Sequence, residues 1–135
     1  MKVLVDTSVW VDFFNEHPSP EAKLLARLID DEVEIVTCGV VIAELFQGIR
    51  RADSMEMLES HFRDMECLSP REPDTYYAAA SLYRKLRAQG ITIRSTIDCL
   101  IVRLAEESNV LLLAKDRDIS LILDSGLVEA RSVPR

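Results

Sequence analysis

Short apolar runs alternate with longer segments of helical periodicity along most of this chain. Strand-like runs are expected at residues 2–6, 33–37, 66–68, 110–114 and 127–130. The segments between successive runs carry apolar residues at helical spacing. Parallel strands need long crossover connections of this kind, whereas antiparallel strands can be joined by tight turns. The pattern therefore predicts an α/β fold with a parallel sheet and helices on both of its faces.

The expected helices are placed by apolar periodicity and by their boundary residues. Helices are expected after residue 6, after Pro20 and from Gly39, and then at residues 53–64, 73–89, 96–108 and 117–123. Gly90 suits the end of the longest helix, because glycine adopts the left-handed conformation that often follows a last turn. We find no repeat or linker, and we expect one domain over residues 1–131 with a short, loose tail at 132–135.

The composition fits a compact domain with its own core. The chain has 135 residues, of which 48% are hydrophobic and 29% charged. Met1 and Lys2 lead directly into the first strand without a signal-peptide pattern, and no apolar stretch approaches the roughly 20 residues of a membrane span. We therefore expect a cytoplasmic protein without a membrane partner. The three cysteines are widely spaced, so we expect them to pack as small apolar residues without forming disulfides or a zinc site.

Four acidic residues stand beside apolar runs instead of in polar segments. They are Asp6, Glu44, Asp98 and Asp116. A carboxylate that leaves water must become protonated, pair with a base or bind a cation. Neither Asp6 nor Glu44 has a Lys or Arg beside it in its own motif. Because Mg²⁺ and Mn²⁺ prefer oxygen ligands, we interpret the four acids as a site for one of these ions.

Each acid also has a structural explanation. Asp6 and Asp116 follow strands and precede helices, where Asp is a favoured N-cap, and Asp98 falls in a first helical turn, where a carboxylate suits the helix dipole. Glu44 shares a helical stripe with small or apolar residues. Ligands of parallel sheets bind beyond the carboxyl ends of the strands, and both Asp6 and Asp116 are expected there. This coincidence favours a common site.

The formal net charge of −7 argues against a generally basic nucleic-acid-binding surface. It does not exclude a nucleic-acid enzyme, since bound divalent ions can be the largest charges that a phosphate meets. Local basic residues then matter more than the total. The candidates for phosphate contact, which equally suit helix C-termini, are Arg50, Arg51, Arg84, Lys85, Arg87 and Arg94.

Taken in order, the acidic motifs resemble those of the PIN-domain ribonucleases, especially the VapC-type toxins of toxin–antitoxin pairs. The motifs are VLVDTS, VIAELFQG, STIDCLIV and LLLAKDRDI, and they lie between residue 1 and about residue 123. The resemblance implies a five-stranded parallel sheet of order 3-2-1-4-5, Mg²⁺- or Mn²⁺-dependent cleavage of RNA such as tRNA or rRNA, a homodimer and a cognate antitoxin. Many relatives place Thr or Ser just before the fourth acid, whereas this chain has Ala114 and Lys115.

The resemblance also assigns roles to individual acids. It implies catalytic and metal-binding roles for Asp6, Glu44, Asp98 and Asp116, with Asp118 as a further metal ligand. We assign Asp6 and Asp98 as the principal ligands of the ion, which would activate water and stabilise the developing charge on phosphorus. His17 and His61 fall in polar segments and are expected to be solvated.

Two alternative functions remain. A haloacid-dehalogenase-like phosphohydrolase would use an Asp after the first strand as nucleophile and a later Lys and acid, as at Lys115 and Asp116. The second Asp that such enzymes carry two residues after the nucleophile is absent, because residue 8 is Ser. The other alternative is a non-catalytic PIN-like binding domain in which the acids are helix caps.

Overall fold

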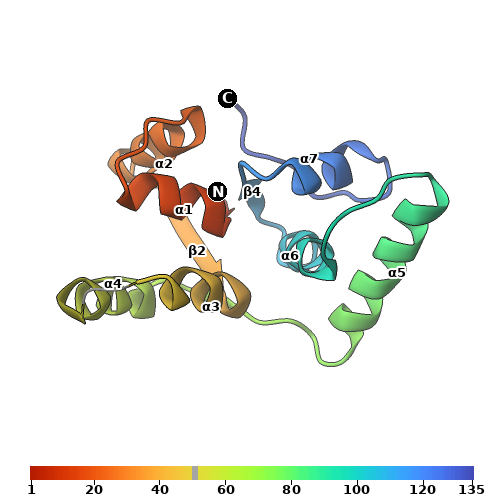
Figure 1. Cartoon of the computed structure of the whole chain (residues 1–135), viewed down its shortest axis with the longest axis horizontal. Coiled ribbons are helices and arrows are strands. Elements are labelled where there is room, and N and C mark those ends of the chain that lie inside the picture. Colours follow the sequence, from red (N-terminus) through yellow and green to blue (C-terminus); the bar gives the residue numbers. More distant parts are fainter. Residues whose placement is uncertain (50–51) are drawn as a thin grey trace.

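The structure is a computed structural model that describes residues 1–49 and 52–135. The described residues contain a four-stranded parallel sheet of order β3-β2-β1-β4, of which Figure 1 labels β2 and β4. Its strands are β1 (Lys2–Val5), β2 (Glu34–Cys38), β3 (Cys67–Leu68) and β4 (Leu111–Leu113). Val3 of β1 lies opposite Ile35 of β2 and Leu111 of β4, which makes β1 a central strand. This confirms the predicted α/β class and the order of the first four strands.

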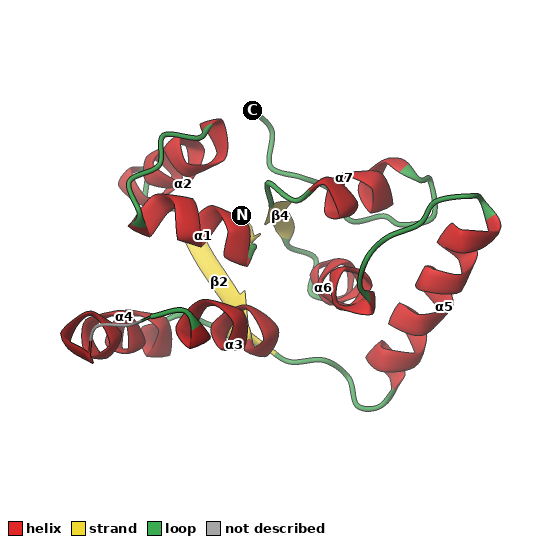
Figure 2. Cartoon of the chain, viewed as in Figure 1, coloured by secondary structure: helices red, strands yellow, loops and turns green. Residues whose placement is uncertain are grey.

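Helices connect the strands and flank the sheet (Figure 2). They are α1 (Thr7–Phe14), α2 (Pro20–Asp30), α3 (Gly39–Gln47), α4 (Ala52–Asp64), α5 (Asp74–Ala88), α6 (Thr96–Glu107) and α7 (Arg117–Asp124). The helix α1 packs against α2 and α3, and α6 packs against α5 and α7. In the described part of the chain, none of these helices is both long and apolar enough to cross a membrane.

Several helix ends are fixed by the residues that the sequence places there. The Ser19 Oγ accepts a hydrogen bond of 3.1 Å from the Ala22 N–H at the start of α2, and Pro20 occupies the first turn. Gly90 has a φ of 79° just after α5, and the following Ile91 N–H donates to the Leu86 carbonyl at 2.9 Å. Local sequence signals therefore account for these boundaries.

The strands form the centre of the hydrophobic core. The side chains of Val3, Leu4 and Val5 are completely buried, as are those of Val102 in α6 and Leu112 in β4. Burying side chains of this size contributes about 1.5–3 kcal/mol each to the free energy of unfolding. The core therefore surrounds the two strands, β1 and β4, after which acidic residues follow.

The prediction of a fifth strand at residues 127–130 is wrong. The Glu129 N–H in this segment donates to the Glu106 Oε2 at 2.6 Å and is therefore not available to a neighbouring strand. The chain reaches β4 later, where a single parallel bridge joins Ser132 to Leu112. Pro134 has no N–H and limits further pairing. Within the tail expected at residues 132–135, Val133 is buried, Arg135 forms an ion pair with Glu21, and the other two residues are exposed.

The cysteines are free thiols, in agreement with the prediction that they form no disulfides. Cys38 and Cys99 are buried and pack in the core. Cys67 is exposed, so the expectation of apolar packing is wrong for this residue. Its strand, β3, is two residues long, lies at the edge of the sheet and has Leu68 as its buried member.

Candidate active site

The topology brings the loops after β1 and β4 to the same end of the sheet, where the carboxyl ends of the strands lie. Asp6 follows β1 directly, and Asp116 lies shortly after β4. The two strands pair in parallel, and the Asp6 N–H extends the pairing by donating to the Leu113 carbonyl at 2.9 Å. The carboxyl ends of neighbouring parallel strands are the usual place for ligand binding in α/β folds. The backbone therefore places both acids where a shared site is expected.

Asp6 is buried and held in one orientation by Ser8. Its Oδ2 accepts hydrogen bonds from the Ser8 N–H at 3.3 Å and from the Ser8 Oγ at 2.8 Å, which caps α1. The Ser8 Oγ also accepts a hydrogen bond of 3.3 Å from the Lys115 N–H, so it links Asp6 to the loop after β4. Burial raises the pKa of the Asp6 carboxyl above its ordinary value, and the two Ser8 contacts oppose that change only in part.

Asp98 occupies the first turn of α6, which begins after the Ser95 cap. Its pKa is raised from 3.8 to about 7, first by burial and then by the negative charges of Asp116, Asp6, Asp118 and Glu44. These charges act on Asp98 because all five acids gather in one region. The carboxyl therefore sits in surroundings that favour a bound proton or a bound cation over a free anion.

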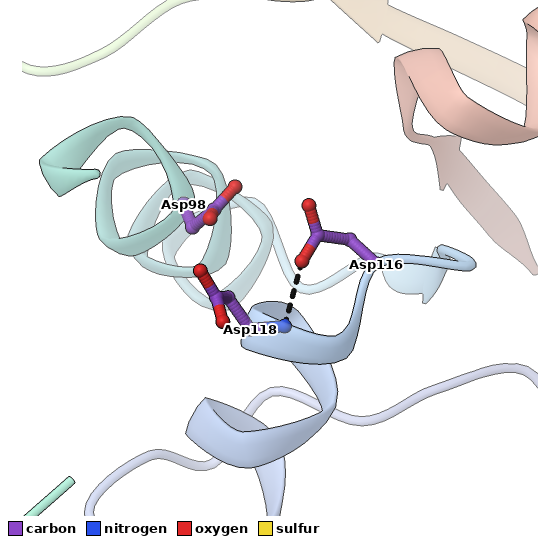
Figure 3. A group of neighbouring side chains, drawn as sticks. All are labelled: Asp98, Asp116 and Asp118. Carbon is purple, nitrogen blue, oxygen red and sulfur yellow. Dashed lines mark hydrogen bonds between the residues drawn. The ribbon is translucent and has the colours of Figure 1, made fainter. Parts of the chain in front are cut away.

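Asp98, Asp116 and Asp118 form the densest part of the cluster (Figure 3). One carboxylate oxygen from each of these residues lies within 4.8 Å of the others. Asp116 also caps α7, because its Oδ1 accepts a hydrogen bond of 2.6 Å from the Asp118 N–H. Its second oxygen takes no part in this cap. Asp116 can thus serve the helix and the cluster at the same time.

Asp118 differs from the other acids because it already has a basic partner. Its side chain is buried, and its Oδ2 accepts hydrogen bonds from the Arg94 N–H at 2.9 Å and from the Arg94 Nε at 3.1 Å. The backbone hydrogen bond from Arg94 is the largest cause that lowers the pKa of Asp118 below its ordinary value. Asp118 is therefore an anion whose charge is largely offset within the protein.

Glu44 reaches the cluster from α3 and is solvent-exposed. The small and apolar residues that share its helical stripe do not bury it, and Gly48 on the same stripe is also exposed. The Glu44 Oε1 accepts a hydrogen bond of 2.9 Å from the Thr7 Oγ1. Because Thr7 follows Asp6, this contact places Glu44 at the outer edge of the acidic cluster.

Three further residues contribute to this site. The sequence predicts that Thr7 and Ser8 supply hydroxyls at this strand end, with helix capping as an equally good explanation, and in the structure they orient the acids Glu44 and Asp6. Arg94 was predicted only as a surface contact for phosphate, and its pairing with Asp118 depends on tertiary structure. Arg50 and Arg51 lie outside the described residues. Arg84, Lys85 and Arg87 lie on the exposed side of α5.

The histidines and Lys115 play other parts. His17 and His61 are exposed, which confirms the prediction that they are solvated. The Lys115 Nζ forms an ion pair with the Asp12 Oδ2 at 2.8 Å. A phosphohydrolase of the haloacid-dehalogenase type would need this amine at the phosphate, so the contact does not favour that alternative.

The donor set fits a hard divalent cation. Asp6, Asp98 and Asp116 offer carboxylate oxygens, and each of these groups lies next to other acids of the cluster. Small hard cations bind to such oxygens and relieve the repulsion between them. Neither a thiolate nor an imidazole belongs to the cluster of described residues that the geometry identifies, so the site does not resemble a zinc centre.

Comparison with known proteins shows what this arrangement is similar to. The sequence profile of the PIN domain matches residues 3–122. Ribonuclease VapC11 of Mycobacterium tuberculosis and VapC ribonuclease Mb1587 of Mycobacterium bovis are each 31% identical over 131 residues, covering 96% of this chain and 98% of the relative.

Solved structures share the fold at lower sequence identity. VapBC-1 from nontypeable Haemophilus influenzae has a TM-score of 0.71 at 18% identity and covers 98% of this chain and 97% of its own. DNA-bound VapBC from Salmonella typhimurium has a TM-score of 0.67 at 11% identity, covering 99% and 97%. VapC20 of Mycobacterium tuberculosis, a toxin that cleaves the sarcin–ricin loop, has a TM-score of 0.59 at 17% identity, covering 96% and 98%.

Proposed function

The chain belongs to the PIN-domain family, and on that premise we propose that it is a metal-dependent endoribonuclease and the toxin of a toxin–antitoxin pair. The observation that carries the proposal is that Asp6, Asp98 and Asp116 lie together where β1 and β4 end. They lie close enough for the charges of Asp116 and Asp6 to raise the pKa of Asp98. The relatives that are 31% identical over nearly the whole chain are named as VapC ribonucleases, which supports the same reaction.

We propose that Asp6 and Asp98 hold Mg²⁺ or Mn²⁺ and that Glu44 and Asp116 complete the site. Such an ion, when bound, lowers the pKa of a water molecule and polarises a phosphoryl oxygen. Ser8 fixes Asp6 by two hydrogen bonds, and Thr7 fixes Glu44 by one. These contacts supply carboxylates that are already oriented before the substrate arrives, so little reorganisation accompanies the reaction.

The most direct test of the reaction is incubation of the purified protein with total cellular RNA. We expect new RNA ends, mapped to a tRNA or an rRNA, when Mg²⁺ or Mn²⁺ is present and none when a chelator removes the ions. New ends that form equally well with the chelator would contradict metal dependence. Intact RNA in the presence of either ion would contradict the ribonuclease proposal itself.

The antitoxin is the second part of the proposal, supported by the likeness to VapBC complexes. We propose that it docks in a groove between α1, α3 and α4 that has Glu44 at one side. The groove has a volume of about 560 Å³, and its apolar lining includes Val11, Phe14, Leu45, Ile49 and Met57. A partner seated there would lie directly beside the acidic cluster and could hinder access to it.

Growth of a bacterial host tests this partner. Expression of the wild-type chain alone should arrest growth, and co-expression of the small protein encoded beside it should relieve the arrest. Met57→Asp changes an exposed side chain of the groove, so it should weaken the relief by the antitoxin without stopping RNA cleavage. Ile29→Asp changes an exposed side chain of α2, outside the groove, and should leave the relief unchanged. Normal growth at verified protein levels, or equal relief of both variants, would contradict the proposed partner or its location.

A homodimer is the third part of the proposal. Trp10 is buried within the chain and stacks on Phe14 with ring centroids 5.4 Å apart, so it is not available to a partner. Tyr76 and Tyr77 on α5 remain exposed, at 45% and 74% of their surface. Light scattering at micromolar concentration should give about twice the chain mass of 15.3 kDa. A mass near that of one chain would contradict the dimer.

We also propose that the protein acts in the cytoplasm, because tRNA and rRNA are found there.

A further inference from the structure

Asp118 and Arg94 form a unit that the proposed metal site does not by itself require. On the basis of the proposed ribonuclease activity, we infer that Arg94 contacts a phosphate of the RNA strand beside the metal site, and that Asp118 is the residue that positions Arg94. This assigns Asp118 a role other than the metal ligation that the family resemblance implies. Asp6, Glu44, Asp98 and Asp116 then form the metal site without it.

The base of the Arg94 side chain is fixed from several directions. Its own N–H and its Nε both donate to the Asp118 Oδ2, at 2.9 Å and 3.1 Å. The residue before it, Ile93, is 2% exposed and anchored in the core, and the residue after it, Ser95, caps α6. The first contact holds the Arg94 backbone and the second holds the Nε of its guanidinium, so one carboxylate oxygen fixes both ends of the same side chain's base. Arg94 therefore has little freedom at its base.

The outer end of the same side chain is open to solvent. The Arg94 side chain is 79% exposed, whereas that of Asp118 is 6% exposed. The Arg94 Nη2 lies 3.8 Å from the Asp116 Oδ1. The two groups are close neighbours, but this distance is too long for a hydrogen bond. The terminal N–H groups are thus displayed beside the acidic cluster. A planar group with several N–H donors is well suited to bind phosphate oxygens.

Asp118 carries features of a positioning residue. Its Oδ2 is already engaged by two N–H donors, and its charge is offset by Arg94, unlike the charges of Asp98 and Asp6. A buried carboxylate paired with a fixed guanidinium is costly to separate, so the pair is expected to persist when substrate binds. Asp118 accordingly stabilises one orientation of Arg94 at the mouth of the site.

The negative charge of the chain and of the site supports a role for Arg94 in binding phosphate. The chain has a formal net charge of −7, and the candidate site is the densest gathering of acids that the described residues show. An RNA phosphate that approaches this edge needs positive charge beyond that of the bound ions. Arg94 offers a cation at the edge of the cluster that can meet the strand while the ion meets the reacting phosphate.

The salt dependence of RNA binding separates phosphate contact from a purely structural role. We would measure binding of a fluorescent single-stranded RNA of mixed sequence, with Mn²⁺ present, in an Asp6→Asn background that is expected to bind RNA without cutting it. Each phosphate contact to a single strand contributes about 0.7 to the slope of log K against log salt. Arg94→Gln should lower this slope by about 0.7 and weaken binding about tenfold at low salt.

Arg131→Gln is the matched control. Arg131 is exposed and lies with Met1 and Lys2 at the opposite edge of the sheet, where the strands begin. The substitution removes the same charge, so it reports any general effect of net charge. It should leave the slope unchanged. If both variants lower the slope equally, or if Arg94→Gln leaves it unchanged, the contact between Arg94 and phosphate is refuted.

A double-mutant cycle tests the role of Asp118. If Asp118 acts through Arg94, Asp118→Asn should weaken RNA binding in the parent but have no further effect once Arg94→Gln is present. Asp118→Asn should also lower the affinity for Mn²⁺ much less than Asp98→Asn does, measured by calorimetry without RNA. Additive losses of RNA binding, or equal losses of Mn²⁺ affinity, would show that Asp118 serves the metal directly and would overturn its positioning role.

These results can be told apart from a failure of the proposed function. Cleavage of total RNA by the wild-type chain tests the ribonuclease activity independently of Arg94. If the wild type cuts RNA and Arg94→Gln keeps the same slope, the inference fails while the ribonuclease proposal stands. If the wild type cuts no RNA, the proposed function fails and the inference falls with it.

Discussion

Substitution of Asp98 tests whether the acids of the candidate site repel one another. The pKa of Asp98 is raised from 3.8 to about 7, with burial as the largest cause and the neighbouring acids next. This difference corresponds to about 4 kcal/mol that opposes folding when the carboxyl is ionised. Because Asp98 is only partly buried, solvent screening reduces the effect to about 2 kcal/mol.

An opposing effect must be subtracted. Asp98 lies in the first turn of α6, where a carboxylate stabilises the helix dipole by about 0.3–1 kcal/mol. Asp98→Asn removes both the repulsion and this stabilisation. Without metal at pH 8, the variant should therefore gain about 1–2 kcal/mol in the free energy of unfolding. For a domain of this size that gain raises Tm by about 3–8 °C.

The pH dependence follows from the direction of the pKa change. Between pH 3.8 and about 7 the folded state holds a proton on Asp98 that the unfolded state has lost. The free energy of unfolding of the metal-free wild type should therefore fall as pH rises through this window. Asp98→Asn lacks this contribution, so the difference in Tm between the two proteins should be large at pH 8 and nearly vanish at about pH 4.

Thermal unfolding followed by circular dichroism in chelator is a sufficient assay. Asp74→Asn is the matched control, because Asp74 is an exposed acid in the first turn of α5 and belongs to no acidic cluster of the described residues. It should melt slightly lower than wild type at pH 8. If Asp98→Asn also melts lower than wild type at pH 8, Asp98 is a helix-start residue and the reasoning about repulsion is wrong.

Three further predictions follow from the same contacts. Mn²⁺ at a hundredfold excess over its Kd should stabilise the wild type by about 2.7 kcal/mol and Asp98→Asn by less; equal gains in a thermal scan would contradict ligation by Asp98. Asp116→Ala should be less stable than Asp116→Asn by about 1 kcal/mol in urea unfolding, because both remove the charge but only Asn keeps the α7 cap, and both should lose RNA cleavage. Ser8→Ala removes the link between Asp6 and the Lys115 N–H, so it should lower Mn²⁺ affinity in calorimetry; unchanged affinity would exclude a role for Ser8 in orienting Asp6.

Much of the fold could be predicted from local sequence. Apolar runs located β1, β2, β3 and β4, because a buried strand in a parallel sheet needs apolar residues on both of its sides. The prediction of a strand at residues 127–130 was wrong because tertiary contacts, and not local sequence, decide what this segment pairs with. The Glu129 N–H bonds to a side chain of α6, and only residues 131–133 reach β4.

In the candidate site, too, local sequence predicts some features, whereas others depend on tertiary contacts. Asp6 and Asp116 could be predicted to approach each other because each follows a strand, and parallel pairing of β1 and β4 then fixes their separation. The partnership of Asp118 with Arg94 could not, since it joins a loop before α6 to the start of α7 across 24 positions of the sequence. A resemblance to other proteins identifies which acids are present, whereas the hydrogen-bond partners show that Asp118 differs from the rest.

The central claim is that carboxylates at one edge of the sheet hold the ion that cleaves RNA, and Asp6→Asn tests it most directly. Asn keeps the size of the side chain and can accept the hydrogen bonds from Ser8, so the variant should fold like the wild type. Rates of RNA cleavage by both proteins would be compared in Mg²⁺ and in Mn²⁺. We predict a loss of more than about a hundredfold, the upper end for residues that only support a metal ligand. Cleavage by folded Asp6→Asn at a rate near that of the wild type would contradict the account.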